Sequence, residues 1–504
     1  MFAVEVGESR FEYDVQALVK AFYPQESVRV ITPDMGREKR EEAEKSLRLK
    51  IELYPDGAKL LFFKPAAGEA AEKGNGEREE DKIYVWNAAA EAEGTAGKTY
   101  KTEFKRFFYS ALADYTQKTL PWGSLTGIRP TKIAMGLLEE GASGEEVISF
   151  LQDTYFVSRR KAALSVEIAQ REKELLSRTH TEDGYSLYIG IPFCPTTCLY
   201  CSFTSYPLCK FKRMVEAYID CLIKELQFVG RACKNKVLDS VYIGGGTPTT
   251  LEPAQLDRLL AALRANFDFA PVQEFTVEAG RADSITKEKL AVLKKHGVGR
   301  ISINPQTMNG ETLKLIGRQA TPEQVREAFA MARAVGGFHI NMDIILGLPN
   351  EGEADVTHTI EEIVAMKPDS LTVHSLAIKR ASELSKWIEE NGMETLKNTD
   401  RTMEIAAQGA EKLGMHPYYL YRQKNMSGNF ENVGYATEGK EGLYNILIME
   451  EKQTIIACGA GSITKMVYPD GRIERCEDVK DVALYIEKID EMIARKRGFL
   501  KYGE

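Results

Sequence analysis

Three cysteines near residue 200 have the spacing of a cluster-binding loop. Cys194, Cys198 and Cys201 form CxxxCxxC in FCPTTCLYC, directly after an apolar run predicted to be a strand, Leu187–Ile191. Three thiolates on one short loop can bind three irons of a 4Fe-4S cube, and the fourth iron then stays open for a small ligand. Zinc needs a fourth protein ligand, and no second CxxC or histidine pair follows nearby. A zinc site and three ordinary buried thiols are the alternatives that stay open.

The composition favours small-molecule chemistry. The 504 residues are 43% hydrophobic, enough for a large core. The net charge of -8 argues against a nucleic-acid partner or an anionic membrane surface. Glu5 and Glu8 interrupt any apolar run after Met1, and no window approaches the roughly 18 apolar residues of a membrane span. Eight cysteines, three of them in one loop, fit a reducing compartment. We therefore predict a soluble, cytoplasmic protein.

The first 180 residues divide into two predicted parts. Strand-like runs at 27–32, 46–52 and 59–63 and an amphipathic segment at 15–22 predict an α+β domain over residues 1–100. The Gly-, Ala- and Glu-rich stretch 65–82 is predicted to be a mobile surface loop. Turn-spaced aromatic residues such as Phe104 and Phe108 predict a helical region over residues 101–180. Its basic turn PWGSLTGIRPTKI either meets an anionic substrate or simply connects two helices.

After residue 180, strand-like and helical runs alternate. Six apolar runs fit strands, at residues 187–191, 241–243, 275–277, 301–303, 340–346 and 371–373, with helical runs such as 218–229 and 256–267 between them. Six β/α units in succession imply parallel strands joined by right-handed crossovers. We predict an α/β fold class: a partial six-stranded (β/α)6 barrel over residues 181–381, after an N-terminal α+β/helical extension. A C-terminal α+β domain, residues 382–504, is predicted to cover the substrate.

Small and polar groups follow nearly every predicted barrel strand. Functional residues of parallel-strand barrels collect at the carboxyl ends of the strands. The glycine run Gly244–Thr249 lets backbone approach a ligand closely, and Glu278, Gln306 and Asp343 come from the next three strands. Arg318 follows twelve residues after Gln306. Each residue alone fits a salt bridge or a cap, but together they predict a ligand site at the barrel mouth.

The motifs resemble those of a known superfamily. CPTTCLYC resembles the signature of the radical SAM enzymes, in which the open iron chelates S-adenosylmethionine (SAM) and reductive cleavage gives a 5′-deoxyadenosyl radical. From Tyr188 to Thr464 the resemblance narrows to the oxygen-independent coproporphyrinogen III oxidases, through YIGIPFCPTTCLYC, YIGGGTPT, VEAGRAD, SINPQT with IGRQAT, and DIILGLPNE. It implies a 4Fe-4S cluster bound by the three cysteines, one or two SAM molecules, and the radical SAM barrel.

The resemblance also implies the residues that bind SAM. Contacts to the cluster-bound SAM would come from Tyr188, Gly245, Glu278 and Ile463. Contacts to a second SAM align with Tyr200, Gly246, Thr247, Gln306, Arg318, Asp343 and Leu376. Two features depart from the usual pattern: Gly190 stands where the family has a histidine, and the region before about residue 177 resembles only a longer branch of the family.

The implied reaction is oxidative decarboxylation of coproporphyrinogen III to protoporphyrinogen IX in porphyrin and heme biosynthesis. An unactivated propionate carbon offers no acidic proton, so a radical is required rather than a general base. The implied partners are the tetrapyrrole substrate, an external electron donor such as flavodoxin or ferredoxin, and an electron acceptor that the sequence does not identify. Basic residues that could hold propionates, or be ordinary solvated charges, are Lys379, Arg380, Arg422 and Lys424.

Two other functions stay open. One is a heme-binding trafficking protein of the same family without decarboxylase activity, and the other is a radical SAM enzyme that modifies or degrades heme. The stretch from Asn429 to Thr437 resembles the NFxGYTT of the oxidases and lacks the HNxxYW of the related heme chaperones, which favours an enzyme. His374, after the sixth strand, could act near the substrate or be a satisfied core histidine.

Overall fold

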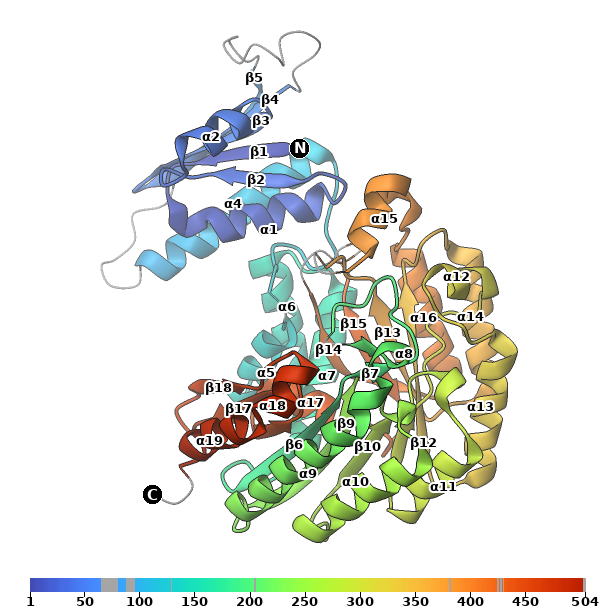
Figure 1. Cartoon of the computed structure of the whole chain (residues 1–504). Coiled ribbons are helices and arrows are strands. Elements are labelled where there is room, and N and C mark those ends of the chain that lie inside the picture. The colour runs from blue at the N-terminus through green and yellow to red at the C-terminus, as the bar shows by residue number, and fades with distance from the viewer. Residues whose placement is uncertain are drawn as a thin grey trace. The chain divides into compact units, whose positions relative to one another are not determined.

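The chain forms two compact units (Figure 1). The computed structural model describes residues 1–64, 80–87, 96–127, 129–203, 205–379, 382–423, 426, 428 and 430–501. One unit contains Met1–Val166 and Arg422–Phe430, and the other contains Glu167–Tyr421 and Glu431–Glu504. Most of the predicted mobile loop, residues 65–79, lies outside the described residues, but residues 80–82 belong to a strand instead.

The first unit contains a five-stranded sheet of order β2-β1-β3-β4-β5. Its strands are β1 (Phe2–Val6), β2 (Val28–Ile31), β3 (Leu47–Tyr54), β4 (Gly57–Phe63) and β5 (Glu80–Asn87). Its helices are α1 (Glu12–Phe22), α2 (Arg37–Glu44), α4 (Ala96–Thr116), α5 (Thr131–Glu139) and α6 (Gly144–Tyr155). Apolar residues at helical spacing, such as Val15, Leu18 and Val19, bury one face of α1 in the core shared with α4. The three predicted strands and the predicted amphipathic helix are confirmed, whereas β1 and β5 were not predicted.

The second unit contains the six predicted parallel strands, each beside the next. They are β6 (Gly184–Ile191), β9 (Val237–Gly245), β10 (Glu274–Glu278), β11 (Arg300–Ser302), β12 (His339–Leu346) and β13 (Ser370–Ser375). The helices between them are α9 (Val215–Ala232), α10 (Pro253–Asn266), α11 (Lys287–Lys295), α12 (Gly310–Leu315), α13 (Pro322–Val335) and α14 (Glu353–Met366). In Figure 1, α9, α10, α11 and α13 follow one another along the outside of these strands. The predicted partial barrel is therefore confirmed.

The C-terminal segment continues the same sheet on both sides. Strand β15 (Asn432–Ala436) runs antiparallel to β13 and carries β14 (His416–Tyr421) on its other side. Strand β16 (Thr454–Cys458) runs parallel to β6 and is followed by β17 (Ile463–Val467) and β18 (Ile473–Glu477). The remaining helices are α7 (Arg159–Leu176), α15 (Leu384–Asn391), α16 (Asp400–Lys412), α17 (Leu443–Glu450), α18 (Val482–Glu487) and α19 (Ile489–Phe499). Both edges of the six-stranded part are thus paired.

Among the described residues, no helix has an apolar stretch long enough to cross a bilayer.

A buried ion network attaches the last helix to the barrel. Lys496 on α19 lies 2.6 Å from a carboxylate oxygen of Glu225 on α9 and 2.6 Å from one of Asp478. All three side chains are at most 1% exposed. The hydroxyl of Tyr485 also donates to Glu225 at 2.5 Å. Because buried charges are tolerated only when they are paired, these groups require one another.

The network predicts that Lys496→Met is strongly destabilising. The substitution leaves the carboxylates of Glu225 and Asp478 buried without their cation, so we expect a loss of about 3–5 kcal/mol in the free energy of unfolding, measured by urea denaturation. Arg495→Ala is the matched control. Its guanidinium pairs with Glu491 at the surface, where both side chains are 46% exposed, and its loss costs at most about 1 kcal/mol. Equal losses for the two variants would contradict the network.

Candidate active site

The cysteine loop is held at both of its ends. After β6, the short strand β7 (Phe193–Cys194) pairs with β8 (Tyr206–Pro207), which places Cys194 opposite Pro207. Between them, the amide of Leu199 donates to the Ile316 carbonyl at 3.1 Å, and the Leu199 carbonyl accepts from the amide of Leu384 at 2.9 Å. The loop that carries Cys198 and Cys201 is therefore fixed by backbone contacts to segments more than a hundred residues away in the sequence.

The glycine run after β9 lies directly against this loop. The amide of Gly246 donates to the Ile191 carbonyl, and the amide of Thr247 donates to the Phe193 carbonyl, each at 2.7 Å. The Thr247 hydroxyl lies 3.5 Å from the sulfur of Cys194. A Cβ on Gly246 would lie 2.6 Å from the Phe193 carbonyl oxygen and 3.0 Å from the Cys194 sulfur. Only glycine leaves room for this approach.

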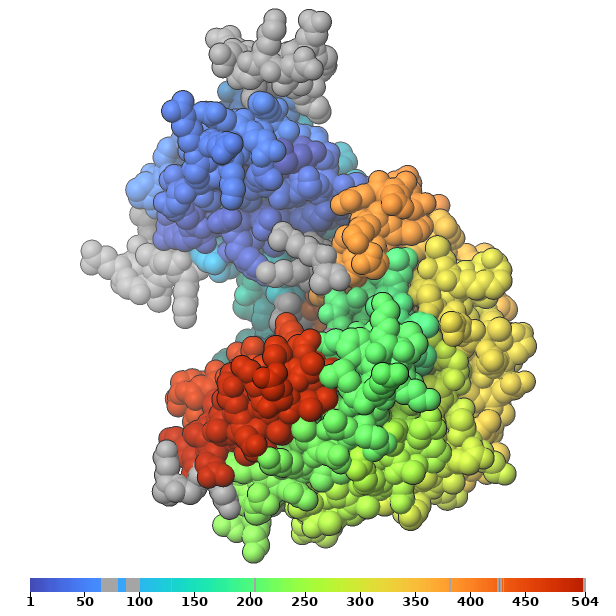
Figure 2. Space-filling view, in the orientation of Figure 1, coloured from blue at the N-terminus to red at the C-terminus, as the bar shows by residue number. Residues whose placement is uncertain are grey.

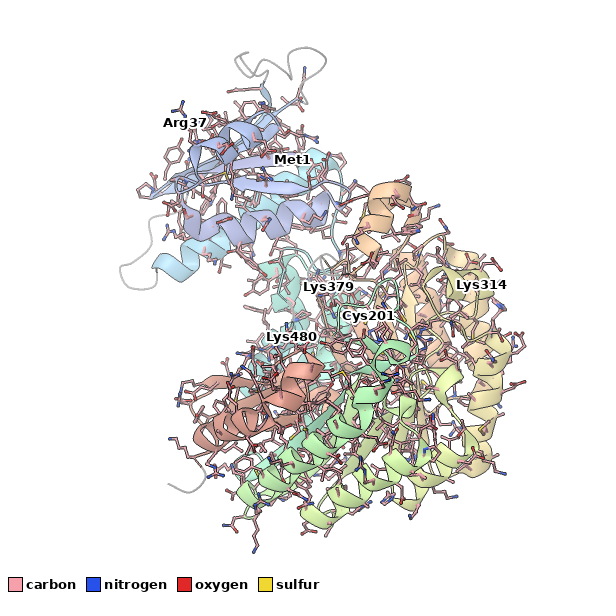
Figure 3. The ribbon with its side chains drawn as sticks, in the orientation of Figure 1. Met1, Arg37, Cys201, Lys314, Lys379 and Lys480 are labelled. Atoms are coloured by element: carbon pink, nitrogen blue, oxygen red, sulfur yellow. The ribbon has the colours of Figure 1, made fainter. Side chains whose placement is uncertain are left out.

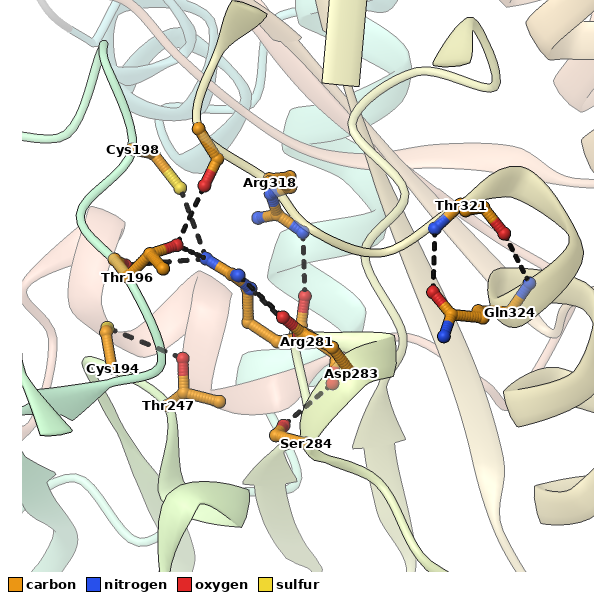
Figure 4. A network of polar contacts seen from close by, with 12 residues as sticks. Cys194, Thr196, Cys198, Thr247, Arg281, Asp283, Ser284, Arg318, Thr321 and Gln324 are labelled. Atoms are coloured by element: carbon orange, nitrogen blue, oxygen red, sulfur yellow. Dashed lines mark hydrogen bonds and ion pairs between the residues drawn. The ribbon is translucent and has the colours of Figure 1, made fainter. Parts of the chain in front are cut away.

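An arginine that the sequence analysis missed lies on the other side of the loop. Arg281 is 3% exposed, and its Nη1 donates to the Thr196 hydroxyl at 3.0 Å and approaches the Cys198 sulfur at 3.7 Å (Figure 4). Asp283 accepts from its Nη2 at 2.7 Å and orients the guanidinium. Arg281 stands three residues after Glu278 in VEAGRAD, so the motif contained it, but nothing local indicated that it contacts the cysteine loop.

The residues of this loop fit a 4Fe-4S cluster better than zinc. All three cysteines are free, partly buried thiols. In the part of the chain that the structure describes, no three Cys, His, Asp or Glu side chains converge as ligands of a single ion, which a zinc site requires. Each thiolate of a cube binds a different iron, so the sulfurs need not meet at one point. Burial raises the pKa of the Cys194 thiol to about 11, so metal binding must displace its proton.

Glu278 ends β10 above a layer of stacked aromatic rings. The Tyr242 hydroxyl donates to its Oε1 at 2.5 Å. The Tyr242 ring stacks on Tyr444 of α17 with centroids 4.4 Å apart, and the Tyr188 ring lies 6.2 Å from that of Tyr242. Burial, with a contribution from Asp343, raises the pKa of Glu278 to about 7, although the bond from Tyr242 opposes this shift. Glu278 is therefore a carboxyl group that can change protonation near neutral pH.

In contrast to Glu278, Asp343 on β12 has a lowered pKa. Burial favours its neutral form, but the nearby imidazole of His374, with help from the hydrogen bond of Asn341, lowers the pKa of Asp343. The Nε2 of His374 lies 3.8 Å from Oδ2, and Asn341 donates to Oδ1 at 2.6 Å. The hydroxyl of Tyr421 lies 3.4 Å from the other ring nitrogen of His374. His374 is thus partly buried with Asp343 and Tyr421 as partners, which fits a satisfied histidine, and its role near a substrate stays a prediction.

Gln306, Arg318 and Tyr200 lie close to these strand ends. The backbone of Gln306 has φ of 69°, its amide donates to the Asp343 carbonyl at 2.9 Å, and its buried Oε1 has no hydrogen-bond partner among the described residues. Arg318 donates to the Asn304 carbonyl at 2.6 Å and to the Tyr200 hydroxyl at 3.4 Å. A left-handed non-glycine residue and an unsatisfied buried amide are typical of a site prepared for a ligand.

The other predicted contact residues have different surroundings. Leu376 is 3% exposed and lies in an apolar cluster with Leu313 and Ile316, whereas Ile463, the first residue of β17, is 42% exposed. Their assignment to SAM, like that of the other predicted SAM contacts, stays a prediction.

Of the four basic residues suggested for propionates, the structure describes Arg422 and Lys379. In the first unit, Arg422 is buried and donates to the Leu125 carbonyl at 2.7 Å, while Lys379 is partly buried in the second unit. Arg380, Lys424 and Asn429, the start of the stretch resembling NFxGYTT, lie outside the described residues.

A partial parallel barrel with a three-cysteine loop after its first strand defines the radical SAM class, and residues 188–363 match the family model described as the radical SAM superfamily. The chain belongs, within it, to the family of oxygen-independent coproporphyrinogen III oxidase-like proteins, being 39% identical over 434 residues to the "Oxygen-independent coproporphyrinogen-III oxidase-like protein HemZ" of Bacillus subtilis. That alignment covers 85% of this chain and 86% of the relative. Membership implies a 4Fe-4S cluster and SAM.

Other relatives carry different names. The heme chaperone HemW of Lactococcus lactis is 30% identical over 277 residues, which cover 55% of this chain and 68% of that protein. Among solved structures, the coproporphyrinogen III oxidase HemN of Escherichia coli has 22% sequence identity and a TM-score of 0.48, covering 64% of this chain and 72% of that one.

Replacing Gly246 should prevent cluster assembly. Gly246→Ala puts a methyl group against the Phe193 carbonyl and the Cys194 sulfur, so we expect iron per protein after anaerobic reconstitution to fall to less than about half of the wild-type value, because the loop must shift. Gly352→Ala is the control, since its Cβ would meet no atom within 4 Å. Iron and sulfide analysis with the visible absorption band measures the result, and equal loading of both variants would contradict the packing argument.

The raised pKa of Glu278 predicts a pH-dependent stability. Between the ordinary pKa of 4.5 and the folded value of about 7, the folded chain keeps a proton on Glu278 that the unfolded chain has released. Stability of the cluster-free protein should therefore fall as pH rises through this window, and Glu278→Gln should flatten the fall. Urea unfolding across the window measures both profiles. Tyr242→Phe removes a bond that lowers the pKa, so it should move the fall to higher pH, and a profile unchanged in both variants would contradict the assignment.

Proposed function

We propose that the chain is a radical SAM oxidoreductase that converts coproporphyrinogen III to protoporphyrinogen IX without oxygen, within heme biosynthesis. The observation that carries the proposal is the 39% identity to an oxidase-like protein, which extends over 85% of this chain and so well beyond the barrel. A cytoplasmic location is part of the proposal, because all eight cysteines are free thiols, as a reducing compartment favours.

The arrangement of residues supports hydrogen-atom chemistry. When bound, the cluster and SAM would supply the means to remove a hydrogen atom from the propionate β-carbon, after which carbon dioxide would leave and one electron would pass to an external acceptor. The chain's own residues would bind and orient SAM and the substrate, and they would exclude water from the site. The cysteine loop would hold the cluster, and Glu278 and the backbone of Gly245 would hold the first SAM. The stacked rings of Tyr188, Tyr242 and Tyr444 lie beside Glu278, through the hydroxyl of Tyr242.

The remaining polar residues would serve a second ligand. Gln306 bonds the backbone of Asp343 on β12, and Arg318 bonds the Tyr200 hydroxyl. Among the described residues, Gln306 keeps an unsatisfied side-chain carbonyl oxygen. We assign this group, with Gly246 and Thr247, to a second SAM or to the substrate. Either ligand would offer the donors that the Gln306 oxygen lacks.

A second candidate function is heme trafficking without decarboxylation. It is favoured by the 30% identity to a heme chaperone over 68% of that protein. Against it stands the longer alignment to the oxidase-like relative, which also spans the N-terminal unit in part. Heme modification by the same radical chemistry is a third outcome that one assay can include.

An anaerobic assay separates these functions. The reconstituted protein is incubated with SAM, dithionite and either coproporphyrinogen III or heme. Formation of the tricarboxylic intermediate and of protoporphyrinogen supports the proposal. Stoichiometric heme binding without turnover supports trafficking, and a methylated or linear tetrapyrrole from heme supports modification.

The three loop cysteines should be indispensable in that assay. Changing Cys194, Cys198 and Cys201 to alanine should abolish the four-iron signal and lower product formation by at least about a thousandfold, because these thiolates would be the protein ligands of three irons of the cube. The matched control changes three cysteines outside the loop, Cys209, Cys221 and Cys476, none of which is fully buried. Electron paramagnetic resonance and product analysis are the measurements. A cluster signal retained in the loop variant would refute the cluster assignment.

A further inference from the structure

A basic surface with an exposed aromatic ring lies beside the cluster loop. Phe203 is 75% exposed, which is rare for so large an apolar side chain. Close to it in the sequence, the helix α8 (Leu208–Phe211) and the helical turn Lys212–Met214 carry three exposed cations. We call these residues the basic face: Phe203, Lys210, Lys212 and Arg213. In Figure 2 the green surface formed by this part of the chain is uncovered on the face in view.

The basic face is rigidly joined to the cysteine loop. Phe203 stands two residues after Cys201, and the β7–β8 pair sets Pro207, the residue before α8, opposite Cys194. The Tyr206 ring packs edge-on against Phe211 at 4.7 Å, and its hydroxyl donates to the Lys480 carbonyl at 3.0 Å. Lys480 and Cys201 are both labelled in Figure 3. The start of α8, which with the turn after it carries the cations, is therefore held in a fixed position relative to Cys194.

The charge of this face differs from that of the whole protein. The chain carries a net charge of -8, yet Lys210, Lys212 and Arg213 form no ion pair with any described residue. The nearest acidic side chains along the sequence are already paired, since Glu216 and Asp220 both bind Arg258. Asp481, beside Lys480, accepts from the amide of Leu484 as the cap of α18. An unneutralised cationic patch on an acidic protein is typical of a docking site for an anionic partner.

From these observations we propose that the basic face is the docking site of an acidic one-electron carrier protein that reduces the cluster. This inference rests on the proposed function, because the chemistry requires an electron from outside the chain. In the step, the reduced carrier loses one electron and the cluster gains it, with no bond formed or broken. An exposed aromatic ring and exposed cations close to it in the sequence are the residue types found at the centre and rim of a transient protein interface. Because Phe203 is two residues from Cys201, a carrier bound at the basic face would bring its own redox group near the cluster.

The test measures carrier binding and cluster reduction separately. The variant Lys210→Glu, Lys212→Glu, Arg213→Glu is compared with wild type, using flavodoxin as the acidic probe. Isothermal titration calorimetry with oxidised flavodoxin gives the dissociation constant without any turnover. Stopped-flow bleaching of the reconstituted cluster gives its rate of reduction by flavodoxin hydroquinone and, separately, by dithionite.

The matched control reverses the same types of charge at the far end of the barrel. Arg231, Lys234 and Lys236 are exposed and precede β9, so they lie at the amino ends of the strands, whereas the cluster loop follows the carboxyl end of β6. Arg231→Glu, Lys234→Glu, Lys236→Glu changes the net charge by the same amount. Far-ultraviolet circular dichroism and iron content show that both triple variants fold and load the cluster.

We expect the basic-face variant to bind flavodoxin at least about tenfold more weakly and to be reduced by it at least about tenfold more slowly at low salt, with a smaller salt dependence than wild type. Dithionite should reduce both triple variants as fast as wild type. Phe203→Ala should weaken binding with the salt dependence unchanged, because it removes apolar contact only.

Equal binding and equal reduction by flavodoxin in the two triple variants would overturn the docking site, and so would a wild-type protein that flavodoxin neither binds nor reduces. Failure of the proposed function looks different. In that case dithionite reduces the wild-type cluster, but coproporphyrinogen III is not consumed. A basic-face effect on flavodoxin alone would then still support the docking site.

Discussion

The close approach of two backbone segments at the barrel mouth is the constraint on which the rest of the site depends. Gly246 and Thr247 donate hydrogen bonds to the carbonyls of Ile191 and Phe193, and this contact leaves no space for a side chain at Gly246. The first two barrel strands thereby set where the cysteine loop begins. Arg281, from the segment after the third strand, then holds the middle of the loop through Thr196. Three consecutive β/α units thus place the thiols before any metal binds, which lowers the ordering entropy that cluster assembly must overcome.

Two carboxyl groups on barrel strands, those of Glu278 and Asp343, have pKa values shifted in opposite directions. Glu278 is buried against aromatic rings and has a hydroxyl donor but no cation, so its pKa is raised to about 7. Asp343 has His374 and Asn341 as partners, and its pKa is lowered. The neutral form of Glu278 can donate a hydrogen bond, whereas Asp343 remains an acceptor that carries charge. One barrel mouth therefore offers both a carboxyl group that can change protonation near neutral pH and a carboxylate that stays ionised.

The sequence predicted the barrel well because its strands are buried on both faces and form continuous apolar runs, which are the strongest local signal. Strand β5 escaped prediction since it alternates exposed residues with Tyr84 and Trp86 at the edge of a sheet. The cysteine loop was singled out by the spacing of its thiols and by its resemblance to a family motif. Arg281 was not, because its partner Thr196 is 85 residues away and only the folded chain brings them together. Alignment with a family likewise could not reveal that Leu376 packs in an apolar cluster.

The C-terminal segment contributes strands to the sheet of the barrel. A six-stranded parallel sheet that does not close leaves two edge strands with unpaired backbone groups. Strand β15 pairs with β13 at one edge and β16 pairs with β6 at the other. Between these two strands, α17 brings Tyr444 against Tyr242, and the amide of Leu443 donates to the carboxylate of Glu274 on β10 at 2.6 Å. Because Tyr242 in turn holds Glu278, a change in how this segment packs would alter the charge state of the barrel mouth.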